Sequence, residues 1–310
     1  MISKKPRYIQ FFPSFRCSLN CSFCFNRYIE PVSEMKPREI GDFIKIIDKA
    51  GIPELDILGG EPTLYANLDT LIDKALNSSM KVFLSTNGSN INVLKHLLKN
   101  NPDKDALNIG ISINKDISCE LNDFIQQHKP FLKGVVTAEQ ILPESVIPLL
   151  QDPHISYYLL FMDPITLHDL KNALPFSDYF KILESLKKRY ENIEGVYCAG
   201  FIPTEQEKSF QVQFRCPAGT TKLSVMPDGS VYPCYLFFRH EKYRLGNILS
   251  DEFEQIWSNP ILNFFRTFKG NQCPLTECEL YKKCCGGCPA VSLLICNNIE
   301  APDPRCMKKR

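Results

Sequence analysis

The chain has 310 residues, of which 44% are hydrophobic and 23% are charged, and its formal net charge is +1. These values are ordinary for a globular protein with one large and one small domain. A charge near zero gives no global basic field, so we expect no nucleic-acid partner. No signal peptide is recognised near the N-terminus, and no apolar run approaches the roughly 20 residues of a membrane span. We therefore expect a cytoplasmic protein with no membrane partner.

Cysteine is unusually frequent, with 14 residues in the chain. Three lie within eight residues near the N-terminus, and nine lie between Cys216 and Cys306. In a reducing compartment, clustered cysteines indicate metal binding or catalysis rather than disulfide bonds.

Short apolar runs alternate with helical patterns through the first two thirds of the chain. The helix over 36–50 is the clearest, because Pro37 suits its first turn and Gly51 ends it. Apolar periodicity further predicts strands at 8–12, 55–58, 82–84, 107–113, 132–136 and 155–161, and helices at 68–76, 93–98, 121–127 and 180–190. This alternation implies βαβ units and a parallel sheet, which about six repeats would form into a partial (β/α)6, TIM-like barrel. Ligands bind at the carboxyl ends of the strands in such folds.

The pattern changes after about residue 205. Two apolar runs, 221–226 and 230–235, flank Pro227-Asp228-Gly229, a strong hairpin signal. A helical pattern over 252–268 is interrupted at Pro260, and the chain from Gln272 onward is rich in Cys, Pro and Gly. That last segment can bury little apolar surface, so bound metal would have to fix its shape. We predict an α/β core domain over 1–205 and a small cysteine-rich domain over 206–310, made of a β-hairpin, a helix and cluster-binding loops.

The first cysteine group, Cys17, Cys21 and Cys24, has the spacing Cys-x3-Cys-x2-Cys directly after the first strand. Three thiolates can hold three irons of a four-iron cluster and leave the fourth open, as a catalytic metal site requires. The alternative is a zinc knuckle or a set of structural cysteines, although zinc would need a fourth ligand nearby. The motif, with its aromatic Phe23, resembles that of the radical S-adenosylmethionine (SAM) superfamily. The resemblance implies that the open iron of a 4Fe–4S cluster chelates SAM. It also implies that one electron splits SAM into methionine and a 5′-deoxyadenosyl radical, which abstracts hydrogen from a substrate.

Segments at the ends of the next four strands resemble the SAM-binding segments of the same superfamily. By this resemblance the Gly-Gly-Glu-Pro run binds the SAM amino group, Ser112 lies near the ribose or carboxylate, and Val135 approaches adenine. Asn114 and Lys115 stand where related enzymes often have Asp and Gly. The SAM-contacting residues implied are Phe23, Gly59, Gly60, Glu61, Pro62, Thr86, Asn87, Ser112 and Val135.

The C-terminal cysteines resemble the SPASM domain, an auxiliary iron–sulfur module found behind radical SAM cores. Cys278-x5-Cys284-x3-Cys288 matches its spacing, while Cys273-x4-Cys278 has two extra residues. The resemblance implies two auxiliary clusters, and two structural zinc sites are the alternative. The implied outer ligands are Cys273, Cys278, Cys284 and Cys306, and the implied inner ligands are Cys216, Cys234 and Cys288.

Some SPASM domains have an eighth cysteine, six residues after the first, at the position that Lys222 occupies in this chain. We therefore expect the inner cluster to have an open iron or to borrow Cys285 or Cys198. We expect Cys119 and Cys296 to be ordinary small core residues.

A hydrogen-abstracting enzyme can also need a proton acceptor. Asp163 is the first candidate, because it follows the strand at 155–161 and would face the cavity at its carboxyl end. Glu139 and His154 are weaker candidates, and a surface or capping role is the alternative for all three. Three arginines either line the cavity or are simply solvated: Arg215, Arg239 and Arg244.

The motifs together predict a radical SAM oxidoreductase that crosslinks or dehydrogenates a ribosomally made precursor peptide. The auxiliary clusters would remove the second electron. Because the first strand begins by about Tyr8, we expect a separate peptide-recognition protein or a substrate that binds without one. By family analogy, a flavodoxin or ferredoxin is the electron donor. The alternatives are a small-molecule dehydrogenase or decarboxylase acting on an alcohol or a tetrapyrrole, and a catalytically silent electron-transfer or scaffold protein.

Overall fold

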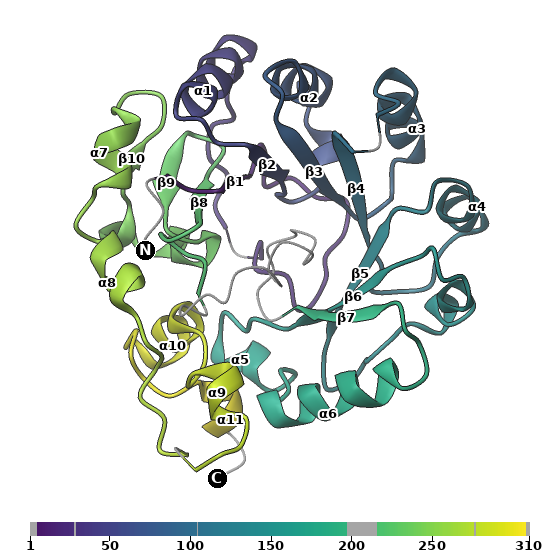
Figure 1. The fold of residues 1–310 in the computed structure, drawn as a ribbon, viewed down its shortest axis with the longest axis vertical. Helices are drawn as coiled ribbons and strands as arrows, with labels where there is room; N and C mark the ends of the chain where they lie inside the picture. The colour runs from purple at the N-terminus through teal and green to yellow at the C-terminus, as the bar shows by residue number, and fades with distance from the viewer. Residues whose placement is uncertain (1–4, 28, 104, 197–215, 276, 308–310) are drawn as a thin grey trace. The chain divides into compact units, whose positions relative to one another are not determined.

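The computed structural model describes residues 5–27, 29–103, 105–196, 216–275 and 277–307. Within these ranges, ten strands form one sheet with the order β10-β9-β8-β1-β2-β3-β4-β5-β6-β7 (Figure 1). The strands are β1 (Tyr8–Phe11), β2 (Glu54–Ile57), β3 (Lys81–Thr86), β4 (Leu107–Ser112), β5 (Phe131–Val136), β6 (Tyr157–Phe161), β7 (Ile193–Val196), β8 (Lys222–Val225), β9 (Ser230–Tyr232) and β10 (Gly246–Asn247).

The strands from β1 to β3 run parallel, as do those from β4 to β7. The predicted hairpin is confirmed, because β8 and β9 pair antiparallel. Its first strand also lies parallel to β1, with Tyr8 opposite Lys222, so the hairpin extends the parallel sheet instead of standing apart from it. The strand β7 was not predicted, because Glu194 and Gly195 interrupt its apolar pattern.

Helices follow most of the parallel strands, which confirms the predicted α/β class. In α1, the apolar side chains of Ile40, Phe43, Ile44 and Ile47 are buried, and Gly51 just beyond the helix has the positive φ of +68° that favours glycine. None of the helices in the described ranges is long and apolar enough to cross a membrane. The helices are α1 (Pro37–Lys49), α2 (Leu68–Asn77), α3 (Ile91–Asn100), α4 (Cys119–His128), α5 (Leu167–Leu170), α6 (Phe176–Lys187), α7 (Phe253–Trp257), α8 (Leu262–Thr267), α9 (Tyr281–Cys284), α10 (Pro289–Cys296) and α11 (Pro304–Met307).

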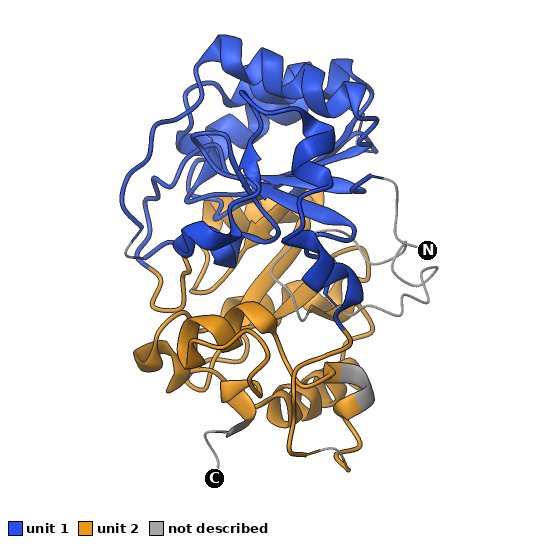
Figure 2. Ribbon diagram, turned by 90° about the vertical axis from the view of Figure 1, so that its left-hand side faces the viewer, with its two compact units in different colours: residues 1–20, 26–109, 200–268 blue, residues 21–25, 110–199, 269–310 orange. Residues whose placement is uncertain are grey.

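The chain divides into two compact units, coloured separately in Figure 2. The first comprises residues 1–20, 26–109 and 200–268, and the second comprises residues 21–25, 110–199 and 269–310. In the first unit, Phe11 of β1 packs on Phe43 of α1 with ring centroids 4.7 Å apart. In the second, Phe161 of β6 packs on Tyr179 of α6 with ring centroids 4.9 Å apart. The predicted domain boundary near residue 205 lies outside the described residues and stays a prediction.

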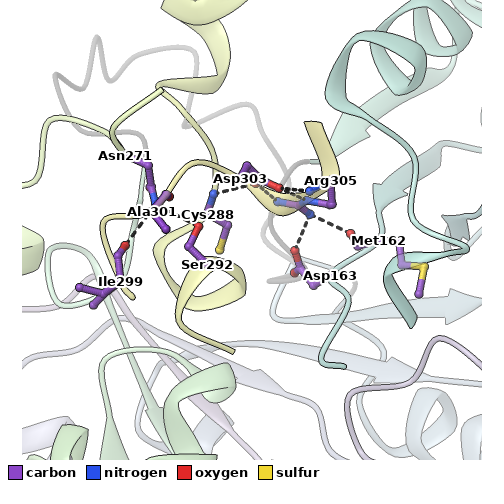
Figure 3. Close-up of polar contacts among 9 residues, drawn as sticks. All are labelled: Met162, Asp163, Asn271, Cys288, Ser292, Ile299, Ala301, Asp303 and Arg305. Atoms are coloured by element: carbon purple, nitrogen blue, oxygen red, sulfur yellow. Dashed lines mark hydrogen bonds and ion pairs between the residues drawn. The ribbon is translucent and has the colours of Figure 1, made fainter. Parts of the chain in front are cut away.

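The C-terminal segment is packed more fully than its composition predicted. Val291 and Leu293 of α10 are buried. The Nδ2 of Asn271 donates to Ser292 Oγ at 3.1 Å and to the Ala301 carbonyl oxygen at 2.6 Å (Figure 3). The prediction that this segment buries little apolar surface agrees with residues 272–288, where none of the described apolar side chains is buried, and was wrong for α10, whose apolar side chains pack inside.

Candidate active site and metal centres

The first cysteine group lies on the loop that leaves β1. Cys17 is exposed, and its Sγ accepts hydrogen bonds from the N–H of Leu19 at 3.4 Å and from Nδ2 of Asn87 at 3.8 Å. Cys21 and Cys24 are half-buried, and the N–H of Cys24 donates to the Cys21 carbonyl oxygen at 3.1 Å. Hydrogen bonds to cysteine sulfur are typical of iron–sulfur ligands, so Cys17 is suited to be a ligand.

The Gly59-Gly60 segment after β2 packs directly on the chain that enters this loop. The N–H of Gly60 donates to the Ser14 carbonyl oxygen at 2.9 Å, and the N–H of Glu61 donates to that of Arg16 at 2.7 Å. A Cβ on Gly60 would lie 2.1 Å from the Arg16 oxygen, and Gly59 has a φ of +137°. Glycine is therefore required at both positions. The sequence predicted close backbone approach to SAM, and in the structure it is the backbone of residues 14–16 that these glycines approach.

Glu61 is a buried carboxylate that ties the loop after β2 to the loop after β3. Its Oε1 accepts from the N–H of Thr63 at 3.1 Å and from the hydroxyls of Thr63 and Thr86, each at 2.7 Å. Its Oε2 accepts from the N–H of Asn87 at 2.7 Å. The side chain of Asn87 in turn reaches the Sγ of Cys17. A continuous set of hydrogen bonds thus runs from Glu61 to the first cysteine, and sequence reasoning did not foresee it.

In the second unit, the ends of β4 and β5 are joined through Asn114. Its Oδ1 accepts from the N–H of Val135 at 2.8 Å, and the N–H of Ile113 donates to the Lys133 carbonyl oxygen at 2.7 Å. Ser112 is half-buried at the end of β4. Asn114, which stands where related enzymes often have Asp, therefore holds the strand segment that carries Val135.

Asp163 lies just beyond the end of β6, as predicted, but its carboxylate belongs to a buried ion pair. Its Oδ1 lies 3.0 Å from Nη1 of Arg305, and its side chain is 7% exposed. The other two proton-acceptor candidates, Glu139 and His154, are exposed. Of the candidate cavity arginines, Arg244 forms a partly exposed ion pair with Glu241, Arg239 donates to the Arg27 carbonyl oxygen, and Arg215 lies outside the described residues.

Two of the proposed auxiliary ligands belong to the first unit. Cys216 is half-buried, and Cys234 is buried just before the 3-10 helix at Tyr235–Arg239. Lys222, at the position of the eighth cysteine, is fully buried, and its Nζ donates to Gln10 Oε1 at 2.9 Å. In the sequence, this contact is indicated only by Gln10, a polar residue within the apolar run at 8–12.

The other five proposed ligands belong to the second unit. Cys273 accepts from the N–H of Leu275 at 3.4 Å, and Cys278 is exposed. Cys284 ends α9, and Cys288 directly precedes α10. Burial raises the pKa of the Cys306 thiol, and negative charges on Asp303 and Cys284 add to this shift. The last effect indicates that Cys306 and Cys284, both predicted outer ligands, lie within electrostatic range of each other. These ligands are Cys273, Cys278, Cys284, Cys288 and Cys306.

The donor set fits thiolate-ligated clusters. Every described cysteine is a free thiol, and both Cys17 and Cys273 accept an N–H from the residue two positions later. Hydrogen bonds to cysteine sulfur of this kind tune iron–sulfur clusters. Within the described ranges, no three His, Cys, Asp or Glu side chains are already grouped to hold a metal ion.

The leftover cysteines differ from their prediction. Cys119 and Cys296 are exposed, so the expectation of core residues was wrong. Cys119 is the first residue of α4 and Cys296 is the last residue of α10. At the end of a helix a small apolar side chain can remain exposed to solvent. Cys285 is half-buried with a positive φ of +48°, and Cys198 lies outside the described residues.

Two family models match the chain. The radical SAM superfamily model covers residues 11–151, and the model of the SPASM iron–sulfur cluster-binding domain covers residues 216–289. The matched ranges contain the Cys-x3-Cys-x2-Cys group and most of the C-terminal array. The chain belongs to the radical SAM superfamily and carries a SPASM domain, as the motifs predicted. An iron–sulfur cluster and SAM are its cofactors.

The sequence is similar to that of mycofactocin maturase MftC of Mycobacterium ulcerans (strain Agy99). The two are 24% identical over 325 residues, which cover 95% of this chain and 86% of MftC. The antilisterial bacteriocin subtilosin biosynthesis protein AlbA of Bacillus subtilis (strain 168) is 22% identical, covering 91% of this chain and 67% of AlbA.

Among solved structures, Streptococcus suis SuiB bound to S-adenosylmethionine has a TM-score of 0.76 at 20% identity. The match covers 98% of this chain and 78% of SuiB. SuiB bound to the precursor peptide SuiA has a TM-score of 0.74 at 19% identity, covering 97% of this chain and 76% of SuiB. These similarities confirm the predicted fold class, a partial barrel with a SPASM domain.

Proposed function

We propose that the protein is a radical SAM oxidoreductase that modifies a ribosomally made precursor peptide, by crosslinking or dehydrogenating one of its residues. The observation that carries the proposal is the Cys-x3-Cys-x2-Cys loop fixed by the Gly-Gly-Glu segment, in a chain that ends in a cysteine-rich SPASM array. Bound to this loop, a 4Fe–4S cluster would supply the electron for reductive cleavage of SAM, and with it the means to remove a hydrogen atom from the substrate.

The residues of this chain would divide the work. Cys17, Cys21 and Cys24 hold the cluster. Glu61 orders the loop after β3, from which the Asn87 amide meets Cys17, while the backbone of Gly59-Gly60 sets the position of the cysteine loop. We assign the remaining SAM contacts to Phe23, Pro62, Thr86, Ser112 and Val135.

The C-terminal array would bind two auxiliary clusters that accept the second electron of the oxidation. We assign Cys216, Cys234 and Cys288 to the inner cluster. The outer ligands are Cys273, Cys278, Cys284 and Cys306. A flavodoxin or ferredoxin would supply the first electron, and a separate protein could deliver the peptide. The SPASM domain would begin near residue 206.

Peptide modification is favoured over small-molecule chemistry by the similarities that run through both parts of the chain. MftC is named a maturase and AlbA a bacteriocin biosynthesis protein, and they match 95% and 91% of this chain. SuiB has been solved with a precursor peptide bound. We infer that the substrate of this chain belongs to the same class.

Mass spectrometry of candidate precursor peptides tests the proposal. Peptides encoded beside the gene would be incubated without oxygen with the reconstituted protein, SAM and a reductant, and 5′-deoxyadenosine would be measured in parallel. We expect one peptide to lose two hydrogens in step with 5′-deoxyadenosine release, and no loss with Cys24→Ala. Release of 5′-deoxyadenosine with every peptide unchanged, but a small alcohol oxidised, would contradict the peptide substrate.

A further inference from the structure

Arg305, beside the last cysteine ligand, is the largest of the described side chains that are fully buried. Asp303 receives its guanidinium in a bidentate pair, with Nε 2.9 Å from Oδ1 and Nη2 2.6 Å from Oδ2. The remaining nitrogen, Nη1, donates to Asp163 Oδ1 at 3.0 Å (Figure 3). One buried cation thus joins two buried carboxylates that are 140 residues apart in sequence.

The end of β6 provides the rest of the surroundings of this guanidinium. Nη1 also donates to the Met162 carbonyl oxygen at 2.7 Å, and the group lies 4.1 Å from the centroid of the Phe161 ring. Three consecutive residues, 161 to 163, therefore hold Arg305 at the carboxyl end of a barrel strand. That end is where ligands bind in such folds.

Asp303 connects the same ion pairs to the cysteine turns. Its Oδ2 accepts from the N–H of Cys288 at 3.0 Å, and its own N–H donates to the Gly286 carbonyl oxygen at 3.1 Å. A Cβ on Gly287 would lie 2.1 Å from the Cβ of Asp303, so this turn is packed tightly against the carboxylate. The positions of Cys288 and of Cys306, which follows Arg305 directly, are fixed by one set of charged groups.

The positive charge of Arg305 lies beside the cysteine turns. A guanidinium keeps its charge in proteins, and Asp303, which pairs with it through Oδ1 and Oδ2, also accepts the N–H of Cys288. A cluster held by thiolates gains negative charge when it is reduced, and a fixed cation in low-dielectric surroundings favours that state.

We propose that Arg305 is a positioning residue of the auxiliary iron–sulfur site. It holds the turns of Cys288 and Cys306 against the end of β6, and its fixed charge raises the reduction potential of the clusters that these cysteines bind. The proposal rests on the proposed function only in assuming that these cysteines bind iron. It also gives Asp163 a role as a counter-charge in this array instead of that of a proton acceptor.

Redox titration followed by electron paramagnetic resonance tests the proposal. The full chain would carry Cys17→Ala, Cys21→Ala and Cys24→Ala in every sample, so that only auxiliary clusters contribute to the signal. Arg305→Gln removes the charge, and Arg305→Lys keeps it while losing the bidentate pair. We expect Arg305→Gln to lower the ratio of reduced to oxidised cluster about tenfold at a fixed ambient potential, equivalent to ~59 mV for one electron, and Arg305→Lys to stay near the parent value.

Asp163→Asn gives a second test that leaves the Asp303–Arg305 pair and both cysteine turns in place. Because it removes a negative charge, we expect it to shift the potential in the opposite direction, and it decides the matter if Arg305→Gln fails to fold. Arg266→Gln is the matched control, since Arg266 is half-buried, donates to the Gly219 and Trp257 carbonyl oxygens and, like Arg305, lies over an aromatic ring, 4.4 Å from the Trp257 ring centroid. It should lower the melting temperature without moving the potential.

An unchanged potential in both Arg305→Gln and Asp163→Asn would overturn the proposal. Equal shifts in Arg305→Gln and Arg305→Lys would also overturn it, because geometry rather than charge would then set the potential. Absence of any auxiliary cluster in the parent chain would remove its premise and refute it. None of these readouts depends on a peptide, so a protein that shows the expected shifts but modifies no peptide would count only against the proposed substrate.

Discussion

The N-terminal cysteine loop and the C-terminal cysteine turns are held in place by different kinds of contact. Around Cys17 the restraint comes from the backbone: glycines without Cβ atoms allow hydrogen bonds to the carbonyl oxygens of residues 14 and 16. Around Cys288 and Cys306 the restraint comes from buried charges, with Arg305 shared between two carboxylates. The first region should therefore be sensitive to added volume, and the second to altered charge.

Loss of a cysteine ligand should have the largest effect on iron binding. It also distinguishes the thiols that bind a cluster from the thiols that are merely exposed. We expect Cys284→Ser to lose a whole auxiliary cluster, about four iron atoms per chain, because its charge acts on Cys306 and both are assigned to one cluster. Cys296→Ser is the matched control, since Cys296 is an exposed thiol at the end of α10. Iron analysis of the reconstituted proteins measures the difference, and equal iron content in the two variants would contradict the assignment.

Removal of the charge of Arg305 should be the most destabilising single substitution of the C-terminal region. Arg305→Gln leaves Asp303 and Asp163 buried without their cation, and breaking a buried ion pair in this way costs about 3–5 kcal/mol. Urea denaturation of the metal-free chain would measure the loss of unfolding free energy. A loss no larger than that of the surface variant Arg244→Gln would show that the ion pairs do not stabilise this unit.

Adding a side chain at Gly60 should displace the N-terminal cysteine loop. Gly60→Ala would place a methyl group 2.1 Å from the Arg16 carbonyl oxygen, so the cysteine loop has to move. A displacement of about 1 Å typically costs on the order of 100-fold in rate, and we expect that loss in SAM cleavage. Gly41→Ala is the matched control, because its Cβ would meet only the end of the Lys74 side chain at 3.6 Å. Equal rates of 5′-deoxyadenosine formation in the two variants would refute the steric role of Gly60.

The smallest expected effect is a loss of stability on substitution of Glu61, whose carboxylate orders the loop after β3. Glu61→Gln keeps an oxygen for the Thr63 and Thr86 donors but turns an amide NH2 toward the N–H of Asn87. Leaving that half-buried donor unsatisfied should cost about 1 kcal/mol, the lower end of the range for buried donors, which thermal unfolding would detect. The exposed Glu144, changed to Gln, should leave the melting temperature unchanged.

Sequence reasoning succeeded where function is carried by local spacing. The Cys17 to Cys24 motif, the Gly59-Gly60 segment after β2 and the hairpin at Asp228-Gly229 are each recognisable from a few neighbouring residues. Strands with uninterrupted apolar runs were also predicted, whereas β7 was missed because Glu194 and Gly195 break its pattern. Local chemistry was thus sufficient for the fold class and for the superfamily, and the ligand set stays a prediction.

Sequence reasoning could not reveal contacts that the fold creates between residues far apart in the chain. The partner of Asp163 is Arg305, 142 positions away, and nothing in either neighbourhood signals the pair. The link from Glu61 to Asn87 likewise depends on adjacent strands bringing two loops together. For Cys119 and Cys296 the residue type suggested burial, but their positions at helix ends decided the outcome.

Cleavage of SAM by the full chain and by the variant with Cys17→Ala, Cys21→Ala and Cys24→Ala tests the central claim most directly. Both proteins would be reconstituted with iron and sulfide and reduced without oxygen, and 5′-deoxyadenosine and methionine would be quantified. We predict that the full chain forms both products in equal amounts and that the variant forms neither while retaining C-terminal iron. Product formation by the variant at the same rate, or none by the full chain, would contradict the assignment of the N-terminal loop as the site of SAM cleavage.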